Sequence, residues 1–347
     1  MDDDSRLITQ MAMIKAVNPA IKVLGYRNSI QAYNWMSIVR EKLDDPQYAD
    51  WFLQYRDGID GATKNSSKYG SNPCNGPAGD NTTKCSKFWH FGLTSFSNPC
   101  PGGECDCGAA PCASYEFDHR NASFADWFVS EYVMGKLGMG DKNQDGMYFD
   151  DGWVGGQPQE VSPSVIVDAG LTRGDIHDIQ CAWQQTFAKA QQAIIDAGGW
   201  NWQLFKQTAN VITTKTTRSA CDSFYRTSCA ANSTMQTANL YYLFSGSGGG
   251  KWFAPTSPFL DIASFLLVRG PYAWIGYAWS QCWGWNGHKG EYFLRPDEFD
   301  YDVGAPLGLC HETEPGSSVW TREWSKATAT VDCKTMNATI DLNLLAD

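Results

Sequence analysis

Two adjacent carboxylates, Asp150 and Asp151, follow the apolar run 147–149 and are themselves followed by a glycine and Trp153. In a parallel α/β protein a short apolar strand is buried on both faces, so a charge at its end lies where the sheet meets solvent. In a barrel this carboxyl end is where active sites are built. A carboxylate beside an aromatic ring that can stack on a sugar predicts sugar chemistry. The alternative interpretation is a strand that ends in an ordinary acidic turn.

A second carboxyl group is needed for glycoside hydrolysis, because one group donates a proton while the other acts as base or nucleophile. Glu116 and Asp118 end the preceding strand-like segment, and neighbouring barrel strands would bring such ends to one substrate. We predict Asp150 as nucleophile or base and Asp118 as its partner acid, with Asp151 or Glu116 as substitutes. The alternative for residues 118–120 is an ion pair that holds the loop in place.

Further polar and aromatic side chains follow the ends of other predicted strands, where they could hold sugar hydroxyls and stack on sugar faces. The predicted substrate-binding residues are Tyr26, Arg27, His119, Arg120, Trp153, Gln207, Trp279 and Trp283. Their convergence on one face is stronger evidence than any one of them, because each alone would be unremarkable in a core or on a surface.

Two segments could in principle hold a metal. Residues 141–146 match the first half of an EF-hand calcium loop, but position twelve is Gly152 and not the bidentate glutamate. The cysteine pattern C-x4-C-x-C-x4-C over 100–112 could bind zinc, but no histidine follows at finger spacing. We expect a polar turn and disulfides in these places, and no metal or cofactor. A Rossmann fingerprint and a G-x-S-x-G elbow are both missing from the sequence.

The composition describes an acidic chain rich in aromatic residues. Of its 347 residues 43% are apolar, which is enough for a sizeable core, and its 15 tryptophans could serve a core or a glycan-binding cleft. The formal net charge of −11 argues against nucleic acid as a partner, which needs a basic surface. The most apolar stretch, 259–279, is broken by Asp261 and Arg269, so we expect no membrane span. We expect a monomer with a carbohydrate substrate.

The 12 cysteines lie in segments rich in glycine and proline, which indicates disulfides formed in an oxidising compartment. We expect Cys221 to pair with Cys229 and Cys310 to pair with Cys333. Cys181 and Cys282 are left over, and their partners cannot be assigned from the sequence.

Glycosylation sequons support a secreted eukaryotic glycoprotein. The five Asn-X-Ser/Thr sites are Asn65, Asn81, Asn121, Asn232 and Asn337. Residues 1–6 contain neither a basic segment nor an apolar one, so they form no signal peptide. We resolve this conflict with the hypothesis that the natural N-terminus is missing.

Helical and strand-like segments alternate along most of the chain. Helices are predicted at 5–17, 30–43, 123–132 and 172–197, strands at 21–26, 113–118, 146–150, 200–205 and 272–279, and a helix or strand near 259–268. Capping boxes are predicted to start two of the helices, with Ser123 and Asp126 in one and Thr172 and Asp175 in the other. Repeated βα units favour a (β/α)8 TIM-type barrel, whose first strand would be missing because the chain opens on a helix.

Two domains follow from this pattern. The first is a catalytic barrel over 1–295, with a cysteine-rich insertion at 57–112 that contains six cysteines. The second is a small antiparallel β region over 296–347, where short alternating segments are separated by turns.

The chain resembles the largely uncharacterised TIM-barrel glycosyl hydrolase families. The matching segments are 22–28, 117–121, 145–151, 301–308 and 319–324. It is similar, more distantly, to α-galactosidase and polygalactosaminidase-type barrels, which keep a catalytic aspartate at the end of a central strand. The resemblance implies that Asp150 is the nucleophile or base, and it leaves the acid open. The missing first strand puts closure of the barrel in doubt, and the insertion at 57–112 could reshape the cleft. The alternative function is a catalytically inactive barrel that binds glycan as a lectin-like protein.

Overall fold

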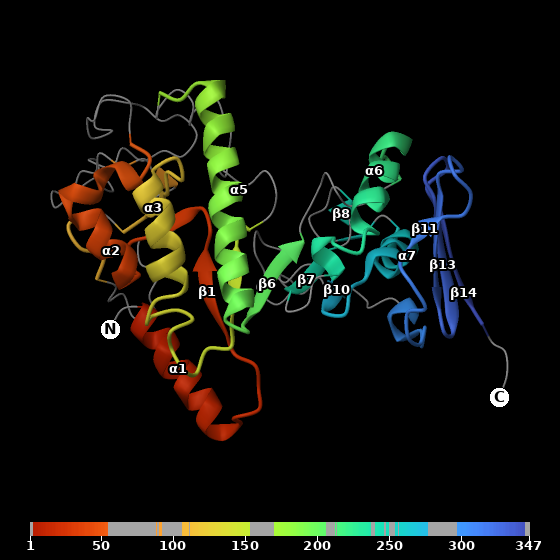
Figure 1. Ribbon diagram of the computed structural model, residues 1–347, viewed down its shortest axis with the longest axis horizontal. Helices are drawn as coiled ribbons and strands as arrows, with labels where there is room; N and C mark the ends of the chain where they lie inside the picture. Colours follow the sequence, from red (N-terminus) through yellow and green to blue (C-terminus); the bar gives the residue numbers. More distant parts are fainter. Residues whose placement is uncertain are drawn as a thin grey trace. The chain divides into compact units, whose positions relative to one another are not determined.

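The structure is a computed structural model that describes residues 3–54, 88, 90–91, 106–110, 112–152, 170–205, 212, 214–236, 240–245, 248–249, 254–255, 257–276 and 297–343. The chain divides into two compact units, Met1–Trp202 and Gln203–Asp347. Each unit is described by itself below, with the element labels of Figure 1.

The first unit combines helices with two kinds of sheet. Its helices are α1 (Asp3–Val17), α2 (Ser37–Asp44), α3 (Ala122–Trp127) and α5 (Arg173–Asp196), with helical turns η1 (Pro46–Trp51) and η3 (Phe128–Val133). Its strands are β1 (Leu24–Asn28), β2 (Gln31–Tyr33), β3 (His90–Phe91), β4 (Ser114–Glu116), β5 (Gly146–Asp150) and the start of β6 (Trp200–Phe205).

Local sequence explains where these helices begin. The predicted capping box at Thr172 and Asp175 is confirmed, and it starts α5 with reciprocal bonds between side chain and backbone. The predicted cap at Ser123 is wrong, because Asn121 caps α3 instead and accepts bonds from the backbone of Ser123 and Phe124.

Strands β1 and β5 form the parallel part of the first unit, with Leu24 opposite Gly146 and Asn28 opposite Asp150. Side chains alternate along each strand, so one face of the pair is buried beneath α5, where the rings of Phe149 and Phe187 lie 5.0 Å apart. The long helix α5 runs beside β1 in Figure 1. The opposite face carries Tyr26, Tyr148 and Asp150, which are half-buried, and Asn28, which is fully buried.

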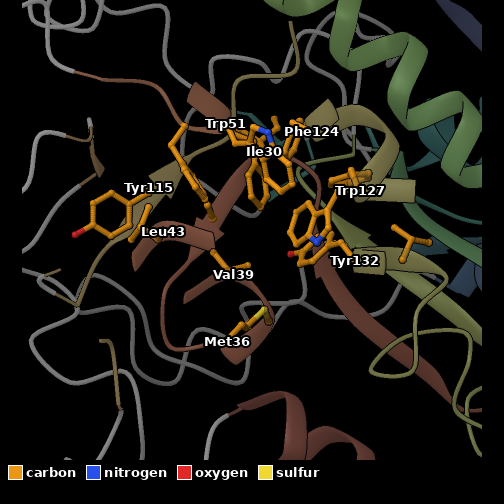
Figure 2. Close-up of a cluster of buried hydrophobic side chains, with 14 of the residues drawn as sticks. Ile30, Met36, Val39, Leu43, Trp51, Tyr115, Phe124, Trp127 and Tyr132 are labelled. Atoms are coloured by element: carbon orange, nitrogen blue, oxygen red, sulfur yellow. The ribbon is translucent and has the colours of Figure 1, made fainter. Parts of the chain in front are cut away.

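The core of the first unit is a cluster of buried apolar side chains (Figure 2). The side chains labelled there are Ile30, Met36, Val39, Leu43, Trp51, Tyr115, Phe124, Trp127 and Tyr132. They come from α2 and the residue before it, from η1, β4, α3 and η3, and from the turn after β1, so their burial holds these helices against the small sheet. A fully buried side chain of this size contributes about 1.5–3 kcal/mol. Because Ile30 belongs to the cluster, the packing also fixes the chain just beyond the end of β1.

The second unit contains α6 (Arg218–Ser228), α7 (Pro258–Val268), and the short turns η4 (Thr234–Gln236) and η7 (Asp297–Asp300). Its strands are β7 (Leu240–Ser245), β8 (Gly248–Gly249), β9 (Ala254–Pro255), β10 (Ala273–Gly276), β11 (His311–Glu312), β12 (Val319–Trp324), β13 (Ala327–Asp332) and β14 (Asn337–Leu342). Strands β7 and β10 pair in parallel. Strands β11 to β14 form the expected C-terminal antiparallel sheet, and α7 packs on it.

The predicted TIM barrel is wrong. Among the described strands β1 has β5 as its single neighbour and β10 has β7, whereas every strand of a closed barrel has two neighbours. The segment predicted as a barrel strand at 113–118 contains β4, which pairs antiparallel with both β2 and β3. The fold is therefore mixed α/β with a β-rich C-terminal region. Sequence pattern failed here because a short buried strand looks the same whether its neighbours are parallel or antiparallel.

Three disulfides join described residues: Cys107–Cys112, Cys221–Cys333 and Cys229–Cys310. The predicted pairs Cys221–Cys229 and Cys310–Cys333 are wrong. Cys221 and Cys229 are eight positions apart at one helix, about 12 Å along its axis, whereas disulfide-linked Cα atoms lie about 4.4–6.8 Å apart. Each therefore pairs with a cysteine of the C-terminal region.

The disulfides fit the expected oxidising, extracellular environment. The Cys107–Cys112 bridge also removes two of the thiolates that a zinc site over 100–112 would need. Among the described residues Cys181 is a free cysteine, while Cys282 lies outside them. Within the described ranges, no helix combines the length and the apolar character needed to cross a membrane.

Candidate functional site

The candidate site lies at the carboxyl ends of β1 and β5. Asn28 and Asp150 are the last residues of these parallel strands and are direct neighbours in the register. Two residues earlier on each strand, Tyr26 lies opposite Tyr148. Because side chains two residues apart share one face of a sheet, these four side chains point to the same side.

A network of hydrogen bonds links Asp150 and Asp151 to β1. The hydroxyl of Tyr26 donates to Oδ2 of Asp150 at 2.9 Å. Nδ2 of Asn28 donates to Oδ2 of Asp151 at 2.7 Å and to the hydroxyl of Tyr33 at 3.0 Å. The hydroxyl groups of Tyr26 and Tyr33 lie 3.4 Å apart and so connect the bond at Asp150 with the bonds made by Asn28. We call these five residues the carboxylate network.

The backbone of Asp151 explains how two adjacent carboxylates reach the same strand. In a regular strand, neighbouring side chains point to opposite faces. Asp151 has a φ of 55°, in the left-handed region that is costly for a residue other than glycine. This turn lets Asp150 contact Tyr26 while Asp151, only 4% exposed, contacts Asn28. Strained backbone of this kind costs about 1–3 kcal/mol and is concentrated at functional sites.

Asn28 is held in its orientation by the chain that follows it. Its Oδ1 accepts hydrogen bonds from the backbone N–H groups of Ile30 at 2.9 Å and Gln31 at 2.6 Å. With its oxygen occupied in this way, the amide presents both N–H groups to Asp151 and Tyr33. The donor that supports Asp151 is therefore positioned before any ligand binds.

The tyrosines of the site remain neutral donors. Burial raises the pKa of Tyr26, and the neighbouring Tyr33 and the charge of Asp150 raise it further. Burial is also the largest cause of the raised pKa values of Tyr33 and Tyr148, with the charges of Asp150 and Asp151 adding to it. Loss of a phenolic proton here would place a third negative charge beside two carboxylates, so the hydroxyls stay protonated through neutral pH.

An aromatic row crosses three strands on this face. The ring centroids of Tyr26 and Tyr148 lie 5.8 Å apart, and those of Tyr148 and Trp202 lie 5.0 Å apart. Trp202 on β6 is 38% exposed, so part of its indole is open to a ligand. Aromatic faces of this kind stack well on the C–H faces of sugars, while Tyr and Trp also offer hydrogen-bond donors. The aromatic row is Tyr26, Tyr148 and Trp202.

Sequence reasoning missed Tyr33 and Trp202 as site residues, and it placed Asn28 at the end of a strand without giving it a role. Trp202 could have been found from the sequence. It follows Trp200 by two positions in the predicted strand 200–205, so both rings point to the same face. Tyr33 could not, because residues 30–43 were predicted as one helix, whereas Tyr33 ends the short strand β2.

The predicted partner acid Asp118 lies in an ion pair. Nε of Arg120 donates to Oδ1 of Asp118 at 2.9 Å, and a terminal nitrogen of Arg120 donates to Oδ2 at 2.7 Å. The other terminal nitrogen of Arg120 donates to Asp175 at the start of α5, at 3.0 Å. These bonds raise the pKa of Arg120 and tie the loop to the helix. The arrangement matches the ion pair that the sequence offered as the alternative for this loop.

Glu116 and Arg27 are fully buried. Glu116 lies on β4, where it pairs with Gln31 of β2. The guanidinium of Arg27 lies 3.0 Å from Asp4 and donates to the backbone oxygens of Tyr26, Tyr132 and Leu137. Arg27 therefore joins α1, β1 and the chain around η3, on the opposite face of β1 from Tyr26.

His119 is buried among phenylalanine rings, with ring centroids 4.9 Å from Phe124 and 5.4 Å from Phe128. Its Nε2 lies 2.9 Å from the backbone oxygen of Ser29 and donates to it. Its Nδ1 has no hydrogen-bond partner among the described residues. Burial lowers the pKa of His119 to about 4, so the neutral ring is a fixed part of the core. The remaining predicted residues, Trp153, Gln207, Trp279 and Trp283, lie outside the described residues.

We expect His119 to make the protein less stable in acid. As the pH falls from 6.5 toward about 4, the unfolded chain binds a proton that the folded chain does not, so the free energy of unfolding decreases. This single group accounts for about 3 kcal/mol by pH ~4. Urea unfolding at several pH values should show a shallower decrease for His119→Gln. His177→Gln, at a side chain 74% exposed, serves as the control and should follow the wild type.

The calcium-like segment at 141–146 is a polar turn. Oδ1 of Asp141 accepts a bond from the backbone N–H of Asn143 at 2.8 Å. Asp145 accepts a bond from the backbone N–H of Val23 at 2.8 Å and pairs with Lys15. These carboxylates therefore stabilise the turn that leads into β5. Across the described part of the chain, no three His, Cys, Asp or Glu side chains are grouped as metal ligands.

Comparison with known proteins does not identify a function, so a functional assignment must come from the chemistry of the site. No protein-family model matches this sequence, and no curated protein matches it significantly.

Proposed function

We propose that the protein hydrolyses O-glycosidic bonds at the carboxyl ends of β1 and β5, with Asp150 as the nucleophile or general base. The observation that carries this proposal is a half-buried carboxylate, oriented by Tyr26, on the same face as the aromatic row. The row would stack on the sugar and the carboxylate would act at its anomeric carbon. The resemblance of residues 145–151 to glycosyl hydrolase barrels supports the same role for Asp150, although the closed barrel itself is not part of the proposal.

The partner acid is assigned by elimination. Both oxygens of Asp118 accept hydrogen bonds from Arg120, and Glu116 is fully buried on β4, so neither carboxyl group is open to a substrate. Asp151 belongs to the carboxylate network and lies next to Asp150, with Asn28 fixing one of its oxygens. We therefore propose Asp151 as the second carboxyl group of the reaction.

The ion pair at Asp118 favours a second candidate, a glycan-binding protein without hydrolytic activity. If Asp151 serves only to hold the strained turn, the carboxylate network supplies Asp150 with no second acid, and the aromatic row would bind sugar without cleaving it. Both candidate functions use the aromatic row to bind sugar, but only the hydrolase would turn over a substrate.

Asp150→Asn separates these candidates. We expect the wild-type protein to release the aryl group from at least one member of a panel of aryl glycosides, or reducing ends from glycan polymers. The variant should lose about 10²–10⁴-fold in kcat, as is typical when a catalytic acid or base is removed. Asp178→Asn, at a carboxylate 71% exposed on α5, is the matched control and should keep full activity.

Two outcomes would contradict the hydrolase. Equal turnover by the wild type and Asp150→Asn would remove Asp150 from the reaction. Glycan binding by the wild type with no turnover on any substrate would establish the binding protein instead.

Trp202→Ala should weaken sugar binding while leaving the chemistry intact. Loss of one stacking ring removes about 0.5–1.5 kcal/mol, so we expect KM for the responsive substrate to rise by about 2–10-fold with little change in kcat. Trp202→Phe keeps a flat ring at this position and should recover most of the affinity. An unchanged KM in Trp202→Ala would exclude the aromatic row from the substrate site.

A further inference from the structure

Three of the five glycosylation sequons lie on described residues, and their surroundings differ. Asn337 and Asn232 are exposed, whereas Asn121 is partly buried at the start of α3. Asn65 and Asn81 lie outside the described residues. An N-linked oligosaccharide is bulky and needs an asparagine on the protein surface, so the exposure of the three side chains distinguishes among them.

Asn337 is well placed to carry a glycan. It is the first residue of β14, and its sequon partner Thr339 lies two positions on, so both side chains point to the same exposed face. Ala338 and Ile340 alternate with them and turn toward the packed face. The preceding turn is ordered, because Asp332 accepts bonds from the backbone of Lys334 and the hydroxyl of Thr335.

Strand β14 is an exposed edge of its sheet, where a covering group would limit pairing with other chains. The strand order of the sheet is β11-β12-β13-β14, so β11 and β14 are the edges. An exposed edge presents unpaired backbone groups to other chains, and very short edge strands are one way in which proteins limit this. Strand β11 has two residues, whereas β14 has six and alternates apolar with polar side chains. A bulky group at Asn337 would protect the longer edge.

Asn121 is occupied by a structural role. Its Oδ1 accepts bonds from the backbone N–H groups of Ser123 and Phe124, at 3.0 and 3.2 Å, and from the hydroxyl of Ser123 at 2.8 Å. Both the asparagine and the serine hydroxyl of this sequon are therefore engaged in starting α3. Asn232, in the turn after α6, has no such cap and is exposed.

We propose that Asn337 carries an N-linked oligosaccharide that covers the edge of β14, that Asn232 is a second acceptor, and that Asn121 remains unmodified. In the reaction Nδ2 of the asparagine forms a bond to the anomeric carbon of an oligosaccharide held on a lipid diphosphate. The bond from that carbon to the diphosphate oxygen breaks, the lipid diphosphate leaves, and Nδ2 releases a proton. The proposal requires that the protein enters the secretory pathway, which the three disulfides support. It does not depend on the proposed glycoside hydrolysis.

Peptide mass spectrometry of the protein isolated from its natural source tests the assignment. Enzymatic release of N-glycans in ¹⁸O-labelled water converts each modified asparagine into a labelled aspartate. We expect the label at Asn337 and Asn232 and none at Asn121. An unlabelled Asn337, or a label at Asn121, would overturn the proposal.

The covering role of the glycan is tested by self-association. Sedimentation velocity of the glycosylated protein, Asn337→Gln and Asn232→Gln should show a shift to larger species for Asn337→Gln alone. Thr339→Ala removes the same sequon while leaving Asn337 in place, and it should reproduce the shift. Equal sedimentation of all four proteins would show that the edge needs no cover.

Discussion

Asp4→Ala should lower the free energy of unfolding of the first unit by about 3–5 kcal/mol, the usual cost of removing one partner of a buried ion pair. Asp4 is fully buried, and its Oδ1 lies 3.0 Å from the guanidinium of Arg27, which is 2% exposed. Without Asp4 the charge of Arg27 stays buried beside Tyr132, with backbone oxygens as its remaining partners. Oδ2 of Asp4 also accepts a bond from the backbone N–H of Ile38, so the N-terminal turn of α2 loses an acceptor as well.

A double variant identifies the buried charge as the cause. Replacing both partners, as in Asp4→Leu with Arg27→Met, should recover much of the loss, because no uncompensated charge remains. Asp126→Ala, at an exposed carboxylate on α3, is the control and should change stability by less than about 0.5 kcal/mol. Urea unfolding measures all four proteins. A loss below about 1 kcal/mol in Asp4→Ala would mean that water reaches the guanidinium in the folded protein.

Replacing Cys221 and Cys333 together by alanine should destabilise the second unit by about 3–4 kcal/mol. The bridge joins α6 to the residue after β13 across 112 positions, and both cysteines are fully buried. Loss of the bridge increases the conformational entropy of the unfolded chain. The Cys229–Cys310 bridge, across 81 positions, lies inside the same loop. The inner bridge shortens the loop that the outer bridge closes, so the cost stays below the ~4.7 kcal/mol expected for an isolated loop of about 100 residues.

The short Cys107–Cys112 bridge provides the comparison. It closes a loop of 5 positions, for which the loop-entropy model predicts about 2 kcal/mol. Thermal unfolding without reductant should therefore rank the Cys221/Cys333 double variant as clearly less stable than the Cys107/Cys112 one. The reverse order would indicate that packing around α6, through the bonds of Asp222 to Ser318 and Trp320, already holds it to the sheet.

Strand β1 carries both a buried ion pair that stabilises the first unit and side chains of the proposed active site. Arg27 points to the core face of this strand and anchors it through Asp4, while Tyr26 and Asn28 point to the opposite face and hold the two carboxylates. Alternation along one strand therefore assigns structural and functional roles to successive residues. Variants at Arg27 should lose activity through unfolding, and variants at Tyr26 through the site.

Much of the local structure could be predicted from the sequence. The strand that ends in Asp150, the capping box at Thr172 and the alternating C-terminal strands depend on contacts within a few residues or on the period of apolar side chains. The abundance of cysteine likewise predicted disulfides before any pairing was known. These features needed no knowledge of distant parts of the chain.

The tertiary structure alone decided what those elements do together. Strand β4 pairs antiparallel with β2 and β3, so the expected barrel does not form among the described strands. Arg120 joins Asp118 to Asp175 at the start of α5, 55 positions away, and Asn28 reaches Asp151 across 123 positions of sequence. Partners of this kind follow from the packing of the whole unit, since side chains far apart in the sequence carry no local signal of their contact. The sequence by itself determined that Asp150 ends one strand and that Tyr26 lies near the end of another. Only the packing of the unit decided that Tyr26 donates to Asp150, that Asn28 donates to Asp151 and that Trp202 lies against Tyr148.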